Sequence, residues 1–279
     1  MSLTILPHNH YVAFESFGVR IAILGNDTRV VGRLHSLAPT ESRACELEDA
    51  EHQLTISTRD GLRFTMKYEL RGERAEEAKG DLWIGGDANL ELALAHVEKH
   101  VGECIGLNAP DHVFLRGGSV LHGDRVLVVA GEGLAGTTTL LDALVRGGAT
   151  PYSDRFAVFD ANGHAVPYTK RAEGTRIEGT NGSTPAPAPD LEARRVGAIV
   201  ETSYRPGIAW QPARVSGGAR MLALLAHAVP SEDRPKDAMA GISRVLEHDP
   251  VVMSGQRGEA DEVARALLAD AELQGSGAA

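Results

Sequence analysis

The sequence predicts an α/β protein, and three local features carry that prediction. The apolar run RVLVVA at residues 125–130 is typical of a buried strand. It leads into the glycine stretch AGEGLAGTTTLL at residues 130–141. Residues 137–146 then read as a helix, which Gly147 and Gly148 end, as glycine commonly does just past a last helical turn. The chain therefore contains the order strand, glycine loop, helix.

Ahead of this unit, residues 1–104 are expected to form an N-terminal mixed α/β module. Between residues 53 and 68, apolar residues alternate on either side of Arg59-Asp60-Gly61, which is typical of a β-hairpin. Residues 19–24 predict another strand. Residues 90–101, LELALAHVEKHV, have apolar side chains at helical spacing and predict a helix.

A second domain is expected over residues 105–270. The sequence FAVFDANGHAVPY at residues 156–168 predicts a hairpin around Asn162-Gly163. Residues 196–201 predict a strand, and helices are expected at 216–228, 235–247 and 259–269. The stretch NGSTPAPAP at residues 181–189 predicts a mobile loop, and residues 271–279 a disordered tail.

Composition narrows the classes of partner. A formal net charge of -10 and a pI near 5.6 argue against nucleic acid and anionic membranes as binding partners. The two cysteines, Cys45 and Cys104, are far apart and lie in no CxxC pattern, so neither a disulfide framework nor a structural zinc site is indicated. With no apolar run of membrane-spanning length and no leader pattern, we expect a cytoplasmic protein. The oligomeric state stays open.

The glycine stretch matches the phosphate-loop pattern G-x-x-x-x-G-K-[ST] except at the lysine, where Thr137 stands. In such a loop the backbone amides and the helix N-terminus bind phosphate, and the last hydroxyl, here Thr138, holds magnesium. We therefore expect a nucleotide phosphate, ATP or another, to be bound by Gly131, Gly133, Gly136, Thr137, Thr138 and Thr139.

Two other interpretations of the stretch stay open. Gly131, Gly133 and Gly136 also spell G-x-G-x-x-G, with Asp154 roughly 20 residues on, where a ribose-binding acid is expected in a dinucleotide fold. That fold needs a further helix and parallel strand after Asp154, whereas the sequence predicts an antiparallel hairpin there. The remaining interpretation is a tight strand-to-helix turn that binds nothing.

Further motifs resemble the HPr serine kinase/phosphorylase-like proteins, in particular those of actinobacterial type. The resemblance covers roughly residues 107–268. Besides the glycine stretch, it rests on FLRGG (114–118), GATPYSDRFAVFD (148–160), VPY (166–168), ETSYRPGIAW (201–210) and SGQRGEADEVARALL (254–268). It implies a P-loop kinase-like core of the HPr kinase/PEP carboxykinase type.

The resemblance also implies roles for individual residues. Asp154 falls on the aspartate that helps bind magnesium and handles the proton of the acceptor hydroxyl, and Thr138 on the magnesium-binding hydroxyl. Thr137 replaces the lysine that grips the phosphates, Arg116 replaces a histidine, and Arg155 replaces a second acid. Because guanidinium groups bind phosphate, Arg116 and Arg155 are expected to take part in the site.

Residues near the end of the resemblance are interpreted as structural. Tyr204, Arg205 and Trp210 lie beside a Pro-Gly turn; they are candidates to line a site, but aromatic side chains beside such a turn more often pack locally. Arg257 and Glu259 precede a helix, and Glu259 favours its positively polarised N-terminus.

The predicted function is that of a divergent HPr kinase-like protein that binds a nucleotide phosphate weakly. Loss of the lysine is expected to impair phosphoryl transfer, so the protein is expected to act through a protein partner. Two alternatives stay open: an active serine kinase that uses arginine in place of the lysine, and a scaffold that binds no nucleotide.

Overall fold

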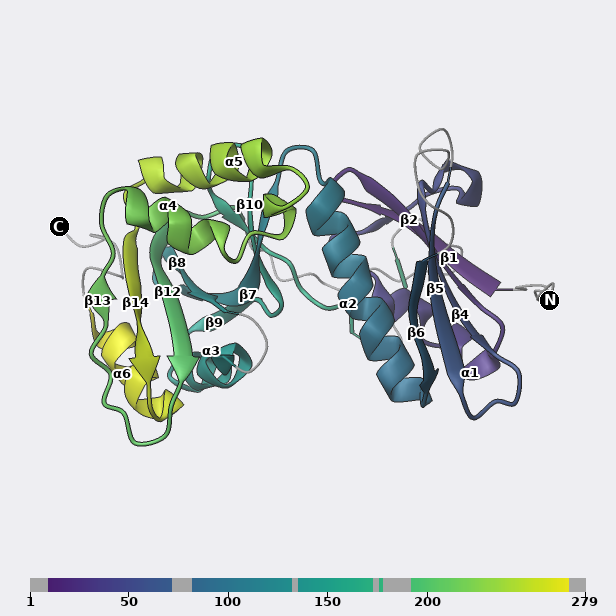
Figure 1. Cartoon of the computed structure of the whole chain (residues 1–279), viewed down its shortest axis with the longest axis horizontal. Coiled ribbons are helices and arrows are strands. Elements are labelled where there is room, and N and C mark those ends of the chain that lie inside the picture. The colour runs from purple at the N-terminus through teal and green to yellow at the C-terminus, as the bar shows by residue number, and fades with distance from the viewer. Residues whose placement is uncertain (1–9, 72–81, 132–134, 173–175, 178–191, 271–279) are drawn as a thin grey trace. The chain divides into compact units, whose positions relative to one another are not determined.

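The computed structural model describes residues 10–71, 82–131, 135–172, 176–177 and 192–270 (Figure 1). The chain is mixed α/β, as predicted, and divides into two compact units. One comprises Met1–Pro110 and Lys170–Pro189, and the other comprises Asp111–Thr169 and Asp190–Ala279. The division that the sequence predicts after residue 104 falls inside a helix, α2 (Leu90–Asn108). The predicted loop at 181–189 and the tail at 271–279 lie outside the described residues.

The first unit is built on a six-stranded mixed sheet with the order β3-β1-β2-β4-β5-β6. Its strands are β1 (His10–Ser16), β2 (Val19–Gly25), β3 (Arg43–Ala44), β4 (His52–Thr58), β5 (Phe64–Leu70) and β6 (Leu82–Ala88). Short helices lie between strands: α1 (Thr28–Val31), η1 (Leu34–Leu37) and η2 (Leu47–Asp49). The predicted hairpin is confirmed as β4 and β5, which pair antiparallel.

Helix α2 packs against the sheet of the first unit (Figure 1). It buries Leu94, Val97, Val101 and Ile105, which recur every three or four residues and so share one face. The sequence predicts this helix only to residue 101. It continues to Asn108 because Cys104 and Ile105 extend the same apolar face.

The second unit contains an eight-stranded sheet with the order β11-β10-β7-β8-β12-β14-β13, and β9 also pairs with β7. Its strands are β7 (Val113–His122), β8 (Arg125–Ala130), β9 (Thr150–Ser153), β10 (Phe156–Phe159), β11 (Ala165–Val166), β12 (Val196–Tyr204), β13 (Ala213–Arg214) and β14 (Val251–Arg257). Strands β8, β12 and β14 run parallel, and β7 runs antiparallel to β8. The predicted hairpin at 156–168 is confirmed as β10 and β11.

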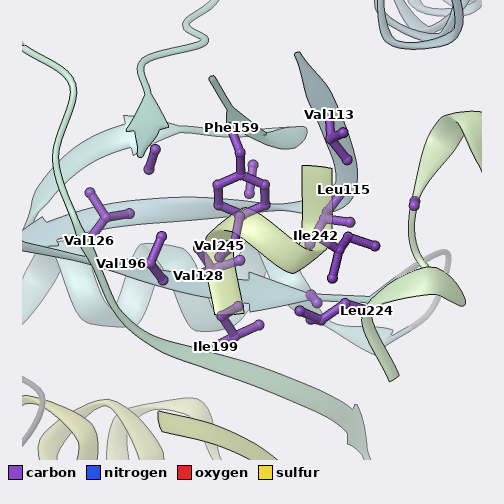
Figure 2. Close-up of a cluster of buried hydrophobic side chains, with 14 of the residues drawn as sticks. Val113, Leu115, Val126, Val128, Phe159, Val196, Ile199, Leu224, Ile242 and Val245 are labelled. Carbon is purple, nitrogen blue, oxygen red and sulfur yellow. The ribbon is translucent and has the colours of Figure 1, made fainter. Parts of the chain in front are cut away.

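Helices cover both faces of this sheet. They are α3 (Thr137–Arg146), α4 (Gly218–Leu225), η5 (Val229–Ser231), α5 (Pro235–Glu247) and α6 (Ala260–Ala269). Along β8, Val126 and Val128 face a cluster that includes Ile242 and Val245 of α5 (Figure 2). The alternate residues of β8 face a second cluster, to which α3 and α6 contribute Leu140, Leu144, Val263 and Leu267. A strand buried on both faces reads as an unbroken apolar run, which is the pattern RVLVVA.

Among the described residues, no helix is both long enough and apolar enough to cross a membrane.

Candidate functional site

The glycine stretch begins where the parallel strands of the second unit end. Ala130, the last residue of β8, pairs with Glu201 of β12, and Tyr204 at the end of β12 pairs with Arg257 at the end of β14. Parallel strands bring their carboxyl ends to one edge of a sheet, and ligands of α/β proteins gather there. At this edge lie Gly131 and residues 135–139, which we call the loop–helix junction.

Close packing explains two of the predicted glycines. Gly136 has φ +74°, in the left-handed region, and a Cβ there would collide with the guanidinium of Arg257. At Gly131 a Cβ would lie 2.9 Å from Cγ2 of Thr137 and 3.0 Å from Cβ of Ala135. The third predicted glycine, Gly133, lies outside the described residues.

The threonines form the first turn of α3. Thr137 is half-buried, whereas Thr138 and Thr139 are exposed. The N-cap residue is Gly136, so no side chain caps the first turn, and the first intrahelical bond runs from the amide of Leu140 to the carbonyl of Gly136 at 3.1 Å. The amides of a first helical turn have no partner within the helix. Their dipoles favour an anion at this end.

The structure brings the backbones of Arg116, Asp154 and Arg155 to the start of the junction. The carbonyl of Arg116 accepts a hydrogen bond from the amide of Gly131 at 3.1 Å, and the amide of Gly117 donates to the carbonyl of Arg155 at 3.1 Å. Arg116 is half-buried, and Asp154 and Arg155 are exposed. Their roles toward a ligand stay predictions.

Asp154 directly follows β9, and the direction of that strand agrees with its expected position. Strand β9 pairs antiparallel with β7, as β8 does, so β9 and β8 point the same way. Ser153 pairs with Ser119 of β7. Ala130 pairs with Gly117, which lies two residues earlier in the same strand. Asp154 therefore lies at the same edge of the sheet as the loop–helix junction.

The dinucleotide interpretation requires the strand after the glycine helix to join β8 in parallel. That strand, β9, pairs with β7 instead, and the neighbours of β8 are the antiparallel β7 and the parallel β12. The hairpin after Asp154 is antiparallel, as the sequence predicts. The sheet therefore lacks the connection that a dinucleotide fold would need at this point.

Arg257, which the sequence places ahead of a helix and which was interpreted as structural, also lies at this edge. Its side chain is only 1% exposed. Nη2 donates to the carbonyl of Gly136 at 2.6 Å, Nη1 donates to the carbonyl of Gly258 at 2.9 Å, and the guanidinium carbon lies 5.5 Å from the ring centroid of Tyr204. Burial lowers the pKa of Arg257, against the opposing charges of Tyr204 and Glu259. The signal that could have found it is the strand VVMSGQR, in which Val252, Met253 and Arg257 are buried.

A carboxylate and an imidazole also meet at this edge. Oε1 of Glu201 lies 3.2 Å from Nε2 of His227, and both side chains are partly buried. The carbonyl of His227 accepts a hydrogen bond from the amide of Arg116 at 2.8 Å. The motif ETSYRPGIAW contains Glu201, but only the tertiary structure brings His227 to it.

The predicted magnesium ligands are Thr138, in the first turn of α3, and Asp154, directly after β9. In the described part of the chain, no three His, Cys, Asp or Glu side chains gather to hold a metal ion. Magnesium bound with phosphates needs only one or two protein carboxylates, and the phosphates supply further oxygens. The roles of Thr138 and Asp154 toward magnesium stay predictions.

No protein-family model matches the chain, and no curated protein gives a significant match. The fold and the site therefore define a mixed α/β protein with a glycine loop at the carboxyl edge of parallel strands. Its function has to be argued from the residues at that edge.

Proposed function

We propose that this protein binds the phosphates of a nucleotide at the loop–helix junction, as a divergent and catalytically impaired relative of the HPr kinase-like proteins. The observation that carries the proposal is the position of the uncapped N-terminus of α3, directly beyond β8 at the carboxyl edge of the sheet. Amide donors and the helix dipole bind anions there without any charged side chain.

The affinity is expected to be low because Thr137 supplies a hydroxyl where related loops have a cation. Losing one partner of a buried charged contact typically costs about 2 to 5 kcal/mol. Millimolar rather than micromolar binding of ATP, GTP or pyrophosphate follows. The same loss weakens neutralisation of the transferred phosphoryl group, so the proposed biological role is regulation of a protein partner by the bound nucleotide.

Calorimetric titration of the full chain with ATP, GTP and pyrophosphate, each with and without magnesium, tests the proposal. We expect millimolar dissociation constants. Heat and competition that are both absent at several millimolar ligand would contradict the proposal and favour the scaffold alternative.

Substitutions at Arg116, Arg155 and Asp154 test whether the phosphates bind at the loop–helix junction. In Arg116→Glu and Arg155→Glu we expect phosphate binding to be abolished, because a carboxylate repels the ligand. In Asp154→Asn we expect the magnesium-dependent part of binding to vanish. Arg146→Gln is the matched control, since Arg146 lies at the other end of α3 in an exposed ion pair with Asp261. Unchanged binding in both charge reversals would show that these arginines serve the protein and not the ligand.

One observation favours the active-kinase alternative. The Glu201–His227 pair is a candidate base at the same edge: it would take the proton of an acceptor hydroxyl while that oxygen attacks the γ-phosphorus and the bond to the leaving ADP breaks. Acceptor-dependent release of ADP that falls at least tenfold in Glu201→Gln, with nucleotide affinity unchanged, would support this alternative. ADP release equal in Glu201→Gln and wild type would exclude the pair as the base.

A further inference from the structure

We infer that Arg257 is the cation that binds phosphate at the loop–helix junction, in place of the absent lysine. This inference rests on the proposed function and deepens it, because it names the charged group that holds the ligand. The ligand class is a phosphate group of a nucleoside di- or triphosphate.

The first support is the position of the guanidinium. It lies against Gly136, the residue immediately before the first turn of α3, and Nη2 donates to the carbonyl of that glycine at 2.6 Å. The guanidinium therefore lies beside the first turn of α3, whose amides are the proposed phosphate donors. A Cβ at Gly136 would collide with Nη2 of Arg257, so a side chain at this position would require the guanidinium to shift.

The second support is that Arg257 forms no described ion pair, although the charge of Glu259 acts on it. Arg257 is 1% exposed, and both of its described acceptors are uncharged carbonyls. The hydroxyl of Tyr204 donates to Glu259 at 3.4 Å, and Glu259 makes no described ion pair with Arg257. A buried charge that no carboxylate contacts directly is costly. Because the N-terminus of α3 adds a second positive pole at the same point, an anion would stabilise both.

The third support is the number of donors that remain. A guanidinium has five N–H groups. Within the described residues, two of these groups meet acceptors, the carbonyls of Gly136 and Gly258, and the buried Nε meets none. Arginine binds phosphate through two parallel N–H donors, so the remaining groups suffice for such a contact.

The experiment titrates inorganic pyrophosphate into the full chain and into Arg257→Gln, with calorimetry for affinity and thermal unfolding for stability. We expect the dissociation constant to rise at least tenfold in Arg257→Gln, and the upward shift of Tm with pyrophosphate to be lost. The matched control is Arg171→Gln, which removes another buried arginine bonded to carbonyls, in the first unit. We expect this control to lower Tm while affinity stays within twofold of wild type.

The outcomes separate the inference from the proposed function. If wild type itself does not bind pyrophosphate, the proposed function fails, and the role of Arg257 fails with it. If wild type binds and Arg257→Gln binds within twofold of it, the proposed function stands and the inference is overturned. Arg257 would then only tie the end of β14 to α3, a role that affects Tm but not affinity.

A measurement on the wild-type protein covers the case in which Arg257→Gln does not fold. The Nε–H resonance of Arg257 is assigned in ¹⁵N-labelled protein by its absence from Arg257→Lys. We expect it to shift as pyrophosphate is added, while the corresponding resonance of Arg146 stays in place. A resonance of Arg257 that does not move at saturating pyrophosphate would overturn the inference.

Discussion

Two buried arginines, one in each unit, differ in what surrounds them. Arg171 in the first unit is 4% exposed and Arg257 in the second is 1% exposed. The guanidinium of Arg171 donates to four backbone carbonyls, those of Pro39, Thr40, Ser42 and Arg176. Arg257 has two described carbonyl acceptors and lies beside a helix N-terminus.

The difference separates a structural role from a binding role. Around Arg171 the acceptors come from residues 39–42 and from residue 176, so the charge joins segments that are distant in sequence. Around Arg257 the described acceptors are two carbonyls, and the neighbouring helix end repels a cation. Burial alone therefore does not indicate which role an arginine has; the number of its acceptors and the groups beside it do.

The largest expected effect is on the stability of the first unit. In Arg171→Gln, four carbonyls lose a charged donor, and buried acceptors left without a partner are destabilising. We expect the free energy of unfolding to fall by about 3 kcal/mol. Urea unfolding measures this loss. A loss below about 0.5 kcal/mol, the range of ordinary surface substitutions, would mean that the carbonyl contacts of Arg171 do not hold this unit together.

A smaller effect is expected at the glycine that Arg257 contacts. In Gly136→Ala the left-handed backbone becomes strained, which costs about 1 to 3 kcal/mol, and the new methyl group displaces the guanidinium. We expect lower stability together with weaker binding of pyrophosphate.

Gly207→Ala is a matched control for this substitution, since Gly207 also has φ +74° but a Cβ there would have nothing within 4 Å. We expect Gly207→Ala to cost stability without affecting pyrophosphate. Equal effects of the two variants on pyrophosphate affinity would mean that displacement of Arg257 is irrelevant to binding.

Restoring a lysine sharpens the comparison further. In Thr137→Lys we expect pyrophosphate to bind about tenfold more tightly, equivalent to about 1.4 kcal/mol, because a second cation joins Arg257 at the junction. The gain should be larger when Arg257 is also changed to Gln, since the lysine then replaces the missing charge. Calorimetry on the single and double variants measures both gains. The control is Thr139→Lys, on an exposed residue of the same turn. An equal gain in this variant would show that any added positive charge near the helix start attracts pyrophosphate.

The smallest expected effect is a pH dependence that distinguishes the two units. Burial lowers the pKa of His35, and the charges of Arg176 and Arg171 lower it further. The unfolded value is about 6.5, so the unfolded chain binds more protons than the folded one below that pH. The stability from neutral His35 is therefore complete above about pH 6.5 and is lost as pH falls toward the folded pKa.

Urea unfolding at several pH values between 5 and 7.5 measures this slope. We expect Arg171→Gln to flatten it, because one of the charges that lower the pKa of His35 is removed. In the second unit burial lowers the pKa of His112, and Arg257 is not among the causes. Arg257→Gln should therefore leave the slope unchanged. A slope that responds to Arg257 and not to Arg171 would contradict this assignment.

Local signals predicted the central elements correctly. Strand β8 and helix α3 have the predicted bounds because an apolar run, a glycine-rich break and a terminal glycine are read from neighbouring residues. The two hairpins were predicted for the same reason. The α/β class and the order strand, glycine loop, helix were therefore determined by the sequence alone.

The partners of the junction were decided by the tertiary structure. Arg257 meets Gly136 across 121 residues of chain, and His227 meets Glu201 across 26. Both contacts form because the central sheet brings distant segments together. Strand β14 pairs in parallel with β12, and the first turn of α3 lies at the same edge of the sheet. A charge pattern along the chain carries no information about such pairings, because parallel strands are joined by long connections whose geometry is set by packing. The sequence by itself thus determined where the glycine loop lies between β8 and α3, and only the fold decided that a buried arginine contacts Gly136 at the start of that helix.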